Sequence, residues 1–341
     1  MTGSPHSIAR MRAAWAVRLI RQATAVLLLL AVAGCASPFT LGRLPSEGPA
    51  LVELGSTPFF PQTEHQCGPA ALATVLGAAG HPVDPSTLTS EVYLPGREGS
   101  LQVELVAAAR ARGLLPLEIG PTLDDLLAEV AAGRPVLVLQ RLGAGPWPNW
   151  HYAVVIGYDR PRQRVLLRSG THERLAQRAA LFESTWSRGG HWGIVLLEPG
   201  QWPARPEPGR YMRAAAELER HSVTAAEAAY RAAVAHWPDS PLPALGLGNV
   251  AAARGDWRDA ERWFRQAQTA DPASAAALNN RVEALQRLGC PNVASRALHD
   301  GMPRVAADDP LRPALVATAR SLPEDATAAA EPAACSEFTL H

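Results

Sequence analysis

Cys67 is the residue of this sequence best placed to act as a nucleophile. It stands directly before Gly68 and Pro69, and an apolar, alanine-rich segment follows. Proline is favoured in the first turn of a helix, so Cys67 is predicted at or just before a helix N-terminus. Free backbone N–H groups and the positive end of the helix dipole favour a thiolate there. We therefore expect cysteine-based covalent catalysis, with a buried structural cysteine as the alternative.

A cysteine nucleophile needs a base within hydrogen-bond reach, and histidine is the usual one. Among the ten histidines, His151 begins an apolar run after the turn-forming sequence Pro-Trp-Pro-Asn. A strand end held in a sheet is a rigid position for a base, so His151 is the first candidate. His191 also precedes an apolar run and is its rival, whereas His172 follows Ser-Gly-Thr in a predicted loop.

The sequence around Cys67 and His151 predicts helices first and strands afterwards. Helical spacing and capping residues predict helices over residues 69–79, 88–92, 101–112 and 122–132, the last with Thr122 as its N-cap. Aliphatic runs bounded by turn residues predict strands over residues 114–119, 135–140, 152–158, 164–168 and 192–197. Helices followed by an antiparallel sheet predict an α+β domain, which we place at residues 58–200.

Two segments of this domain resemble a known family of peptidases. The first is Gln62, four further residues, Cys67-Gly68-Pro69 and the alanine-rich helix; the second is HYAVVIGYD at residues 151–159. In this order and spacing they resemble the bacteriocin-processing, double-glycine type of cysteine peptidase, which belongs to the papain-like superfamily. The resemblance covers about residues 58–199 and implies a papain-like cysteine peptidase fold.

The resemblance also implies a role for each matching residue. Cys67 would be the nucleophile and His151 the general base that later protonates the leaving amine. Gln62 matches the glutamine whose amide helps to form the oxyanion hole, with the backbone N–H of Cys67 as second donor. The family usually carries Asp or Asn about 17 residues after the histidine, but this chain reads VLLRSGT there. Ser169 is the nearest polar residue, and we expect it to orient the imidazole.

The N-terminal segment is typical of an exported bacterial protein. Several arginines precede the apolar run 23–33, which is shorter than the roughly 20 residues of a membrane-spanning helix. The run ends in Val-Ala-Gly-Cys35, which resembles a lipobox and implies a signal peptide over residues 1–34 and lipidation of Cys35. Ala36 then implies the periplasmic face of the outer membrane of a Gram-negative bacterium. An ordinary secreted protein is the alternative.

The C-terminal half is repetitive. Residues 35–57 are predicted to be a tether and residues 201–209 a proline-rich linker, after which a shift of 34 residues pairs Tyr230 with Phe264 and Pro238 with Pro272. That period is typical of tetratricopeptide repeats, whose helix pairs stack to form a groove for a partner. We predict an all-α tetratricopeptide-repeat domain over residues 210–305 and a Pro/Ala-rich tail over residues 306–341.

Composition narrows the function further. The 341 residues include 32 basic and 32 acidic ones, so the chain lacks the basic excess of a nucleic-acid-binding protein. Its four cysteines form no CxxC pair, and we expect no metal site and no cofactor. Cys290 and Cys335 would be able to pair in an oxidising compartment, and the sequence leaves this open.

The sequence as a whole favours a membrane-anchored cysteine peptidase with a Cys–His dyad. Its partners would be a peptide or protein substrate, a protein held by the helical repeats, and the membrane through Cys35. A catalytically silent peptide-binding scaffold is one alternative, because no acidic residue is found to complete the site. A thiol amidase or acyltransferase is another, because it would use the same nucleophile.

Overall fold

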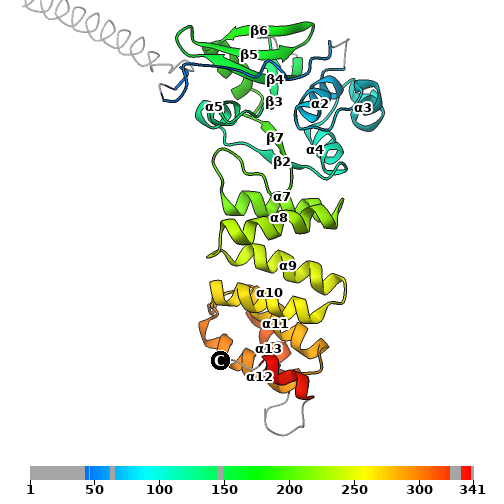
Figure 1. Cartoon of the computed structure of the whole chain (residues 1–341), viewed down its shortest axis with the longest axis vertical. Coiled ribbons are helices and arrows are strands. Elements are labelled where there is room, and N and C mark those ends of the chain that lie inside the picture. The colour runs from blue at the N-terminus through cyan, green and yellow to red at the C-terminus, as the bar shows by residue number, and fades with distance from the viewer. Residues whose placement is uncertain (1–42, 46, 62–65, 144–148, 323–331, 339–341) are drawn as a thin grey trace, which may run out of the picture. The chain divides into compact units, whose positions relative to one another are not determined.

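The structure of the chain is a computed structural model that describes residues 43–45, 47–61, 66–143, 149–322 and 332–338 (Figure 1). The predicted signal peptide, Cys35 and Gln62 lie outside the described residues. Residues Leu44–His341 form one compact unit. Within its described residues, no helix is both long and apolar enough to cross a membrane.

The first part of this unit is helical, as predicted. Its helices are α2 (Cys67–Ala78), α3 (Pro85–Val92), α4 (Gln102–Arg110) and α5 (Leu123–Ala131). Thr122 is the N-cap of α5, and its side chain accepts a hydrogen bond from the backbone N–H of Asp125. α3 begins three residues before its predicted start, because Asp84 caps it and Pro85 fits its first turn.

The strands form one seven-stranded antiparallel sheet, with the order β2-β7-β3-β4-β5-β6 and with β1 paired to β4. Five of them follow α5, whereas β1 precedes α2 and β2 lies between α4 and α5. The strands of this sheet are β1 (Leu51–Glu53), β2 (Leu115–Glu118), β3 (Val136–Leu142), β4 (Asn149–Asp159), β5 (Arg164–Ser169), β6 (His172–Arg178) and β7 (Gly193–Leu197). The five predicted strands are therefore present, and the α+β class is confirmed.

Two strands and one α-helix were missed by the sequence reading, as was the short 3₁₀ helix η1 (Pro95–Arg97). β1 lies within residues 35–57, which were predicted to be a tether. That prediction is wrong for residues 51–53, because they pair with the end of β4. His172 was expected in a loop, but it begins β6, an edge strand whose mostly exposed, polar residues hide the strand pattern. α6 (Ala179–Ser187) connects β6 to β7 and buries Phe182 and Trp186.

Both faces of the sheet are covered, which explains the continuous apolar runs of its central strands. Along β3, Leu137 and Leu139 lie in the core beneath α2, α3 and α4. Val136 and Val138 lie in the opposite core, which also contains side chains of α5 and α6. The sheet therefore forms a rigid layer between two cores and fixes the positions of the residues at its strand ends.

The C-terminal part of the chain is helical. It comprises α7 (Pro208–Glu219), α8 (Val223–His236), α9 (Pro241–Ala253), α10 (Trp257–Ala270), α11 (Ala275–Arg287), α12 (Pro291–Gly301), α13 (Arg312–Ser321) and the 3₁₀ turns η2 (Met302–Arg304) and η3 (Ala333–Phe338). α8, α10 and α12 begin at residues 223, 257 and 291, which are 34 residues apart. Small residues let neighbouring helices approach closely. In α9, a Cβ on Gly248 would lie only 2.3 Å from the ring of Phe264 in α10.

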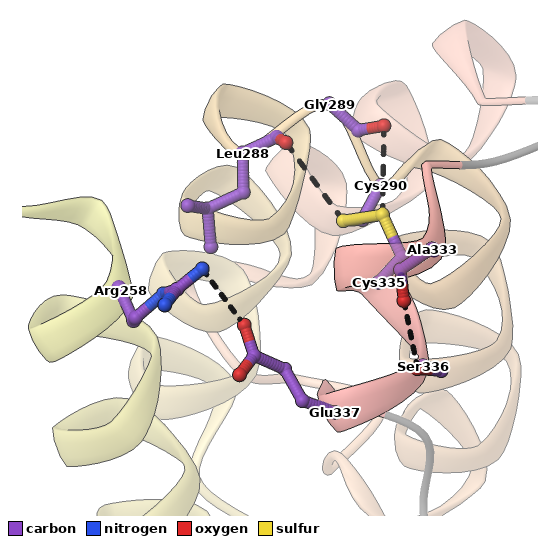
Figure 2. The surroundings of a disulfide bond; sticks show 8 residues. All are labelled: Arg258, Leu288, Gly289, Cys290, Ala333, Cys335, Ser336 and Glu337. Atoms are coloured by element: carbon purple, nitrogen blue, oxygen red, sulfur yellow. Dashed lines mark hydrogen bonds and ion pairs between the residues drawn. A yellow bond between two sulfur atoms is a disulfide. The ribbon is translucent and has the colours of Figure 1, made fainter.

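The tail carries ordered structure that the sequence left undecided. α13 lies in the predicted tail, and η3 is joined to the start of α12 by a disulfide between Cys290 and Cys335 (Figure 2). Cys290 and Cys335 are both buried in the same hydrophobic cluster, with 1% and 2% of their surface exposed. The pairing considered from the sequence is therefore present.

Candidate active site

Cys67 is the first residue of α2, and the helix behind it is buried from Gly68 to Leu76. The backbone amides of Tyr152, Gly68 and Cys67 itself act to lower the pKa of the Cys67 thiol, because they stabilise the thiolate. Burial acts in the opposite direction and is the larger effect, so the pKa of the Cys67 thiol is raised above its ordinary value. The expectation of a thiolate at this helix N-terminus is thus corrected, because desolvation outweighs the helix end.

His151 is the third residue of β4, where β3 pairs with it on one side. Its Nε2 lies 2.8 Å from Oγ of Ser169, a buried residue at the end of β5. This is the contact expected for an orienting residue. Burial lowers the pKa of His151, because the charged imidazolium is desolvated there. With a proton on Nε2 donated to Ser169, Nδ1 carries the free lone pair of a neutral imidazole.

Cys67 and His151 share one cavity of about 970 Å³. The backbone amide of Tyr152 contributes to the pKa of the Cys67 thiol, so the start of β4 lies beside the start of α2. The cavity is lined by Cys67, Arg97, Glu98, Gly99, Ser100, Leu101, Gln102, Leu139, Asn149, Trp150, His151, Tyr152, Gly170, Arg188, Gly189 and Gly190. Its size is ordinary for a pocket that encloses a small ligand or a short peptide segment.

The cavity has mixed polarity. Trp150 offers an apolar surface that is 50% exposed, and Arg188 reaches across the rim to donate a hydrogen bond to the Gly143 carbonyl. Gly189 forms part of the wall where any side chain would clash, since a Cβ would lie 2.1 Å from the Leu139 carbonyl oxygen. The pocket therefore combines a rigid backbone wall with aromatic and charged side chains at its mouth.

Ser100 is a cavity residue that the sequence reading missed. Its Oγ is buried and has no hydrogen-bond partner within the part of the chain that the structure describes, and it packs so tightly on Gly68 that a Cβ there would lie 2.5 Å from it. A serine just before a helix reads as an N-cap, but the N-cap of α4 is Leu101, which makes no side-chain cap. Ser100 therefore presents an unused hydroxyl beside the residue that follows Cys67.

The rival histidine, His191, is engaged elsewhere. Nε2 of His191 lies 2.9 Å from Oε1 of Glu183, and its ring packs against Trp186. His191 and His172 are both missing from the residues that line the cavity of Cys67. Asp159 accepts hydrogen bonds from Arg162 across the β4–β5 turn, as expected for a turn residue. Among the described histidines, His151 is the one that shares a cavity with Cys67.

Comparisons with known proteins point to the same part of the chain. Residues 56–191 match the model of a family described as the Peptidase_C39 like family. No match was found among the curated proteins.

Two matching solved structures show which proteins this region is similar to. One is described as a C39-like peptidase from Bacillus anthracis, with 21% identity, a TM-score of 0.38, and coverage of 44% of this chain and 98% of that chain. The other is the peptidase domain of Streptococcus ComA, described as a bifunctional ABC transporter involved in a quorum-sensing pathway. It has 20% identity, a TM-score of 0.33, and coverage of 41% of this chain and 98% of that chain.

Proposed function

We propose that the chain is a cysteine peptidase that hydrolyses peptide bonds with Cys67 as nucleophile and His151 as general base. The observation that carries this proposal is their placement in one cavity, with Cys67 at the start of α2 and His151 held on β4 by Ser169. The family match over residues 56–191 supports the same reaction class.

The pKa directions define the form of the mechanism. Because burial raises the pKa of Cys67 and lowers that of His151, the resting site holds a thiol and a neutral imidazole. His151 takes the thiol proton as the sulfur attacks the substrate carbonyl carbon, and the imidazolium then gives that proton to the leaving amine. Water, deprotonated by His151, finally hydrolyses the thioester and releases the new carboxylate.

The negative oxygen of the tetrahedral intermediate needs hydrogen-bond donors. The backbone amides of Cys67 and Gly68 stabilise negative charge at the sulfur, and the Ser100 hydroxyl lies beside Gly68 without a partner among the described residues. We assign these three groups to the oxyanion, with the side chain of Gln62 as a further donor by resemblance to the peptidase family.

A peptide-binding scaffold without catalysis is the second candidate. It is favoured by Ser169, because a hydroxyl stabilises the imidazolium less than the carboxylate found in a full triad.

The rest of the chain would bring the site to its substrate. We propose that the lipobox-like sequence leads to lipidation of Cys35 and anchors the protein at the periplasmic face of the outer membrane. We further propose that α7–α12 are tetratricopeptide repeats that recruit a protein partner or substrate. The 34-residue spacing of α8, α10 and α12 supports this assignment.

Cleavage of a peptide library in ¹⁸O-labelled water tests the proposed reaction. The wild-type protein should generate new C-termini that carry ¹⁸O, and Cys67→Ala and His151→Ala should generate none. His191→Ala is the matched control and should remain active, because His191 lies outside the cavity. Binding of peptides without new C-termini would establish the scaffold, and ammonia release or acyl transfer without ¹⁸O-labelled peptides would establish the amidase or acyltransferase instead.

A further inference from the structure

A second polar cavity, of about 570 Å³, lies in the helical part of the chain. Its walls come from α10, α11, α12, η2 and η3, and it shares no lining residue with the cavity of Cys67. Its polar lining includes Arg265, Gln268, Arg281, Asp300, Arg304 and Glu337. Nothing in the proposed peptidase reaction uses it.

Arg281 is the unusual member of this cavity, because its guanidinium is buried and incompletely paired. The residue is 2% exposed; its Nε donates to Glu261 Oε1 and its Nη1 to Gln268 Oε1, both at 3.0 Å. Its Nη2 is buried and has no hydrogen-bond partner among the described residues, and the same holds for Oε2 of Glu261. A buried charged donor left unpaired is costly, so the ion pair of Arg281 with Glu261 is incompletely satisfied at the edge of this cavity.

Two further guanidinium groups face the same space. Arg265 has Glu261 as its nearest carboxylate, at a loose 3.8 Å. Arg304 donates to the backbone carbonyl of Asp300 at 2.8 Å, and the structure gives it no carboxylate partner among the described residues. Three arginines from α10, α11 and η2 therefore converge with unused hydrogen-bonding capacity.

The acidic groups near the cavity do not cancel this charge. Glu261 is shared between Arg281 and Arg265, and Glu337 is held by Arg258 at 3.0 Å (Figure 2). Asp300 lies 3.1 Å from His299. When Arg258, the partner of Glu337 outside the cavity lining, is counted with Arg265, Arg281 and Arg304, four guanidinium groups face the three carboxylates of Glu261, Asp300 and Glu337.

The geometry points to an oxyanion-binding site in this cavity: we propose that Arg265, Arg281 and Arg304 bind a carboxylate or phosphate group of a ligand. Guanidinium groups bind both through charge-assisted hydrogen bonds, and the enclosed setting strengthens them. The disulfide between Cys290 and Cys335 holds η3, and with it Glu337, as one wall of the site.

Isothermal titration calorimetry on the full-length chain at low salt tests this site, with sodium phosphate and sodium acetate as the two probes. Arg265→Gln and Arg304→Gln should each weaken binding by about tenfold, the effect of losing one charge-assisted hydrogen bond. Arg281 itself is left intact, because its removal would leave Glu261 buried and unpaired. Arg262→Gln is the matched control, since Arg262 lies on α10 but does not line the cavity.

A variant that removes a negative charge is expected to change anion binding in the opposite direction. Glu337→Gln removes an acid from the cavity wall and should tighten the binding of either anion. Phosphate binding without acetate binding would identify a phosphate-bearing ligand, and acetate binding would identify a carboxylate. The proposal is overturned if neither probe binds the wild-type protein, or if Arg262→Gln weakens binding as much as Arg265→Gln does.

Discussion

At the scale of single residues, burial decides the protonation of the proposed dyad. Backbone amides at the start of α2 and of β4 favour the thiolate of Cys67, yet desolvation still raises the pKa of its thiol. The same effect lowers the pKa of His151. The pair is therefore better described as a thiol with a neutral base than as a resting thiolate–imidazolium ion pair.

The pH dependence of peptide cleavage should report this state. A base must be unprotonated, so activity falls when the pH drops through the pKa of His151. Since burial lowers that pKa, the acid limb of kcat/KM should lie below pH 6.5, the ordinary value for histidine. Since the pKa of Cys67 is raised, the thiol should keep its proton to above pH 9.0. An acid limb above pH 6.5 would contradict the assignment of His151 as a desolvated base.

Ser169 should act through His151. Ser169→Ala removes the acceptor that lies 2.8 Å from Nε2 of His151. One neutral hydrogen bond contributes about 1 kcal/mol, so kcat/KM should fall roughly fivefold. Ser169→Asp should move the acid limb to higher pH, because a carboxylate stabilises the imidazolium. Unchanged pH profiles in both variants would show that Ser169 does not orient the imidazole.

Ser100 should matter in the transition state. Ser100→Ala is expected to lower kcat more than it raises KM, because the hydroxyl would donate to an oxygen that becomes charged only during the reaction. Steady-state kinetics on one cleaved peptide separates the two parameters. A pure KM effect would instead make Ser100 a substrate-binding residue.

The sequence predicted which residues lie together in the candidate site, but not how deeply they are buried. The types and order of Cys67, His151 and Ser169 were readable because each stands at the end of a patterned element. Ser100 was not readable, since its role depends on contact with Gly68, 32 residues away in the chain. The raised pKa of Cys67 was not readable either, because local sequence shows the helix end but not the depth of burial.

At the scale of elements, the attachment of the N-terminal segment to the sheet depends on Arg168. This buried residue donates hydrogen bonds to the carbonyls of Gly55, Thr57 and Glu173, and so joins β5 both to the residues after β1 and to β6. Helices and central strands were predictable from apolar period and capping. β1 and β6 were not, because edge strands with exposed polar side chains lack that period.

Arg168→Met should therefore destabilise the fold. It leaves three carbonyls without their donor, and we expect the free energy of unfolding to fall by about 2–4 kcal/mol. Arg174→Met is the control, because it breaks an ion pair with Glu53 at the exposed edge and should cost much less. Urea denaturation of both variants measures the difference, and equal losses would contradict the buried role of Arg168.

At the scale of the whole molecule, the helical part is continuous with the sheet. Tyr211 and Leu218 of α7 and Ala226 of α8 belong to the same buried cluster as Val136 and Val155 of the sheet. Trp202, in the predicted linker, packs against Tyr211, His236 and Trp237. Short helical repeats were predictable from their period, but this shared core was not, because no pattern in the linker indicates it.

The disulfide should stabilise the C-terminal end. It closes a loop across a sequence separation of 45 residues, so the double variant Cys290→Ser/Cys335→Ser should lose up to about 4 kcal/mol of stability. Hydrogen exchange should place the loss in α12, α13 and η3, while Cys67-dependent cleavage persists. Equal exchange in the two proteins at these segments would show that the disulfide adds no constraint there.

Trapping of the acyl-enzyme tests the central claim most directly. The protein is mixed with an activated peptide ester, quenched in acid during turnover, and digested for mass spectrometry. The proposed mechanism predicts a hydroxylamine-sensitive thioester on Cys67 that forms in the wild-type protein and in His191→Ala but is lost in His151→Ala. Equal acylation of Cys67 in His151→Ala, or ester cleavage in Cys67→Ala at the wild-type rate, would contradict the account.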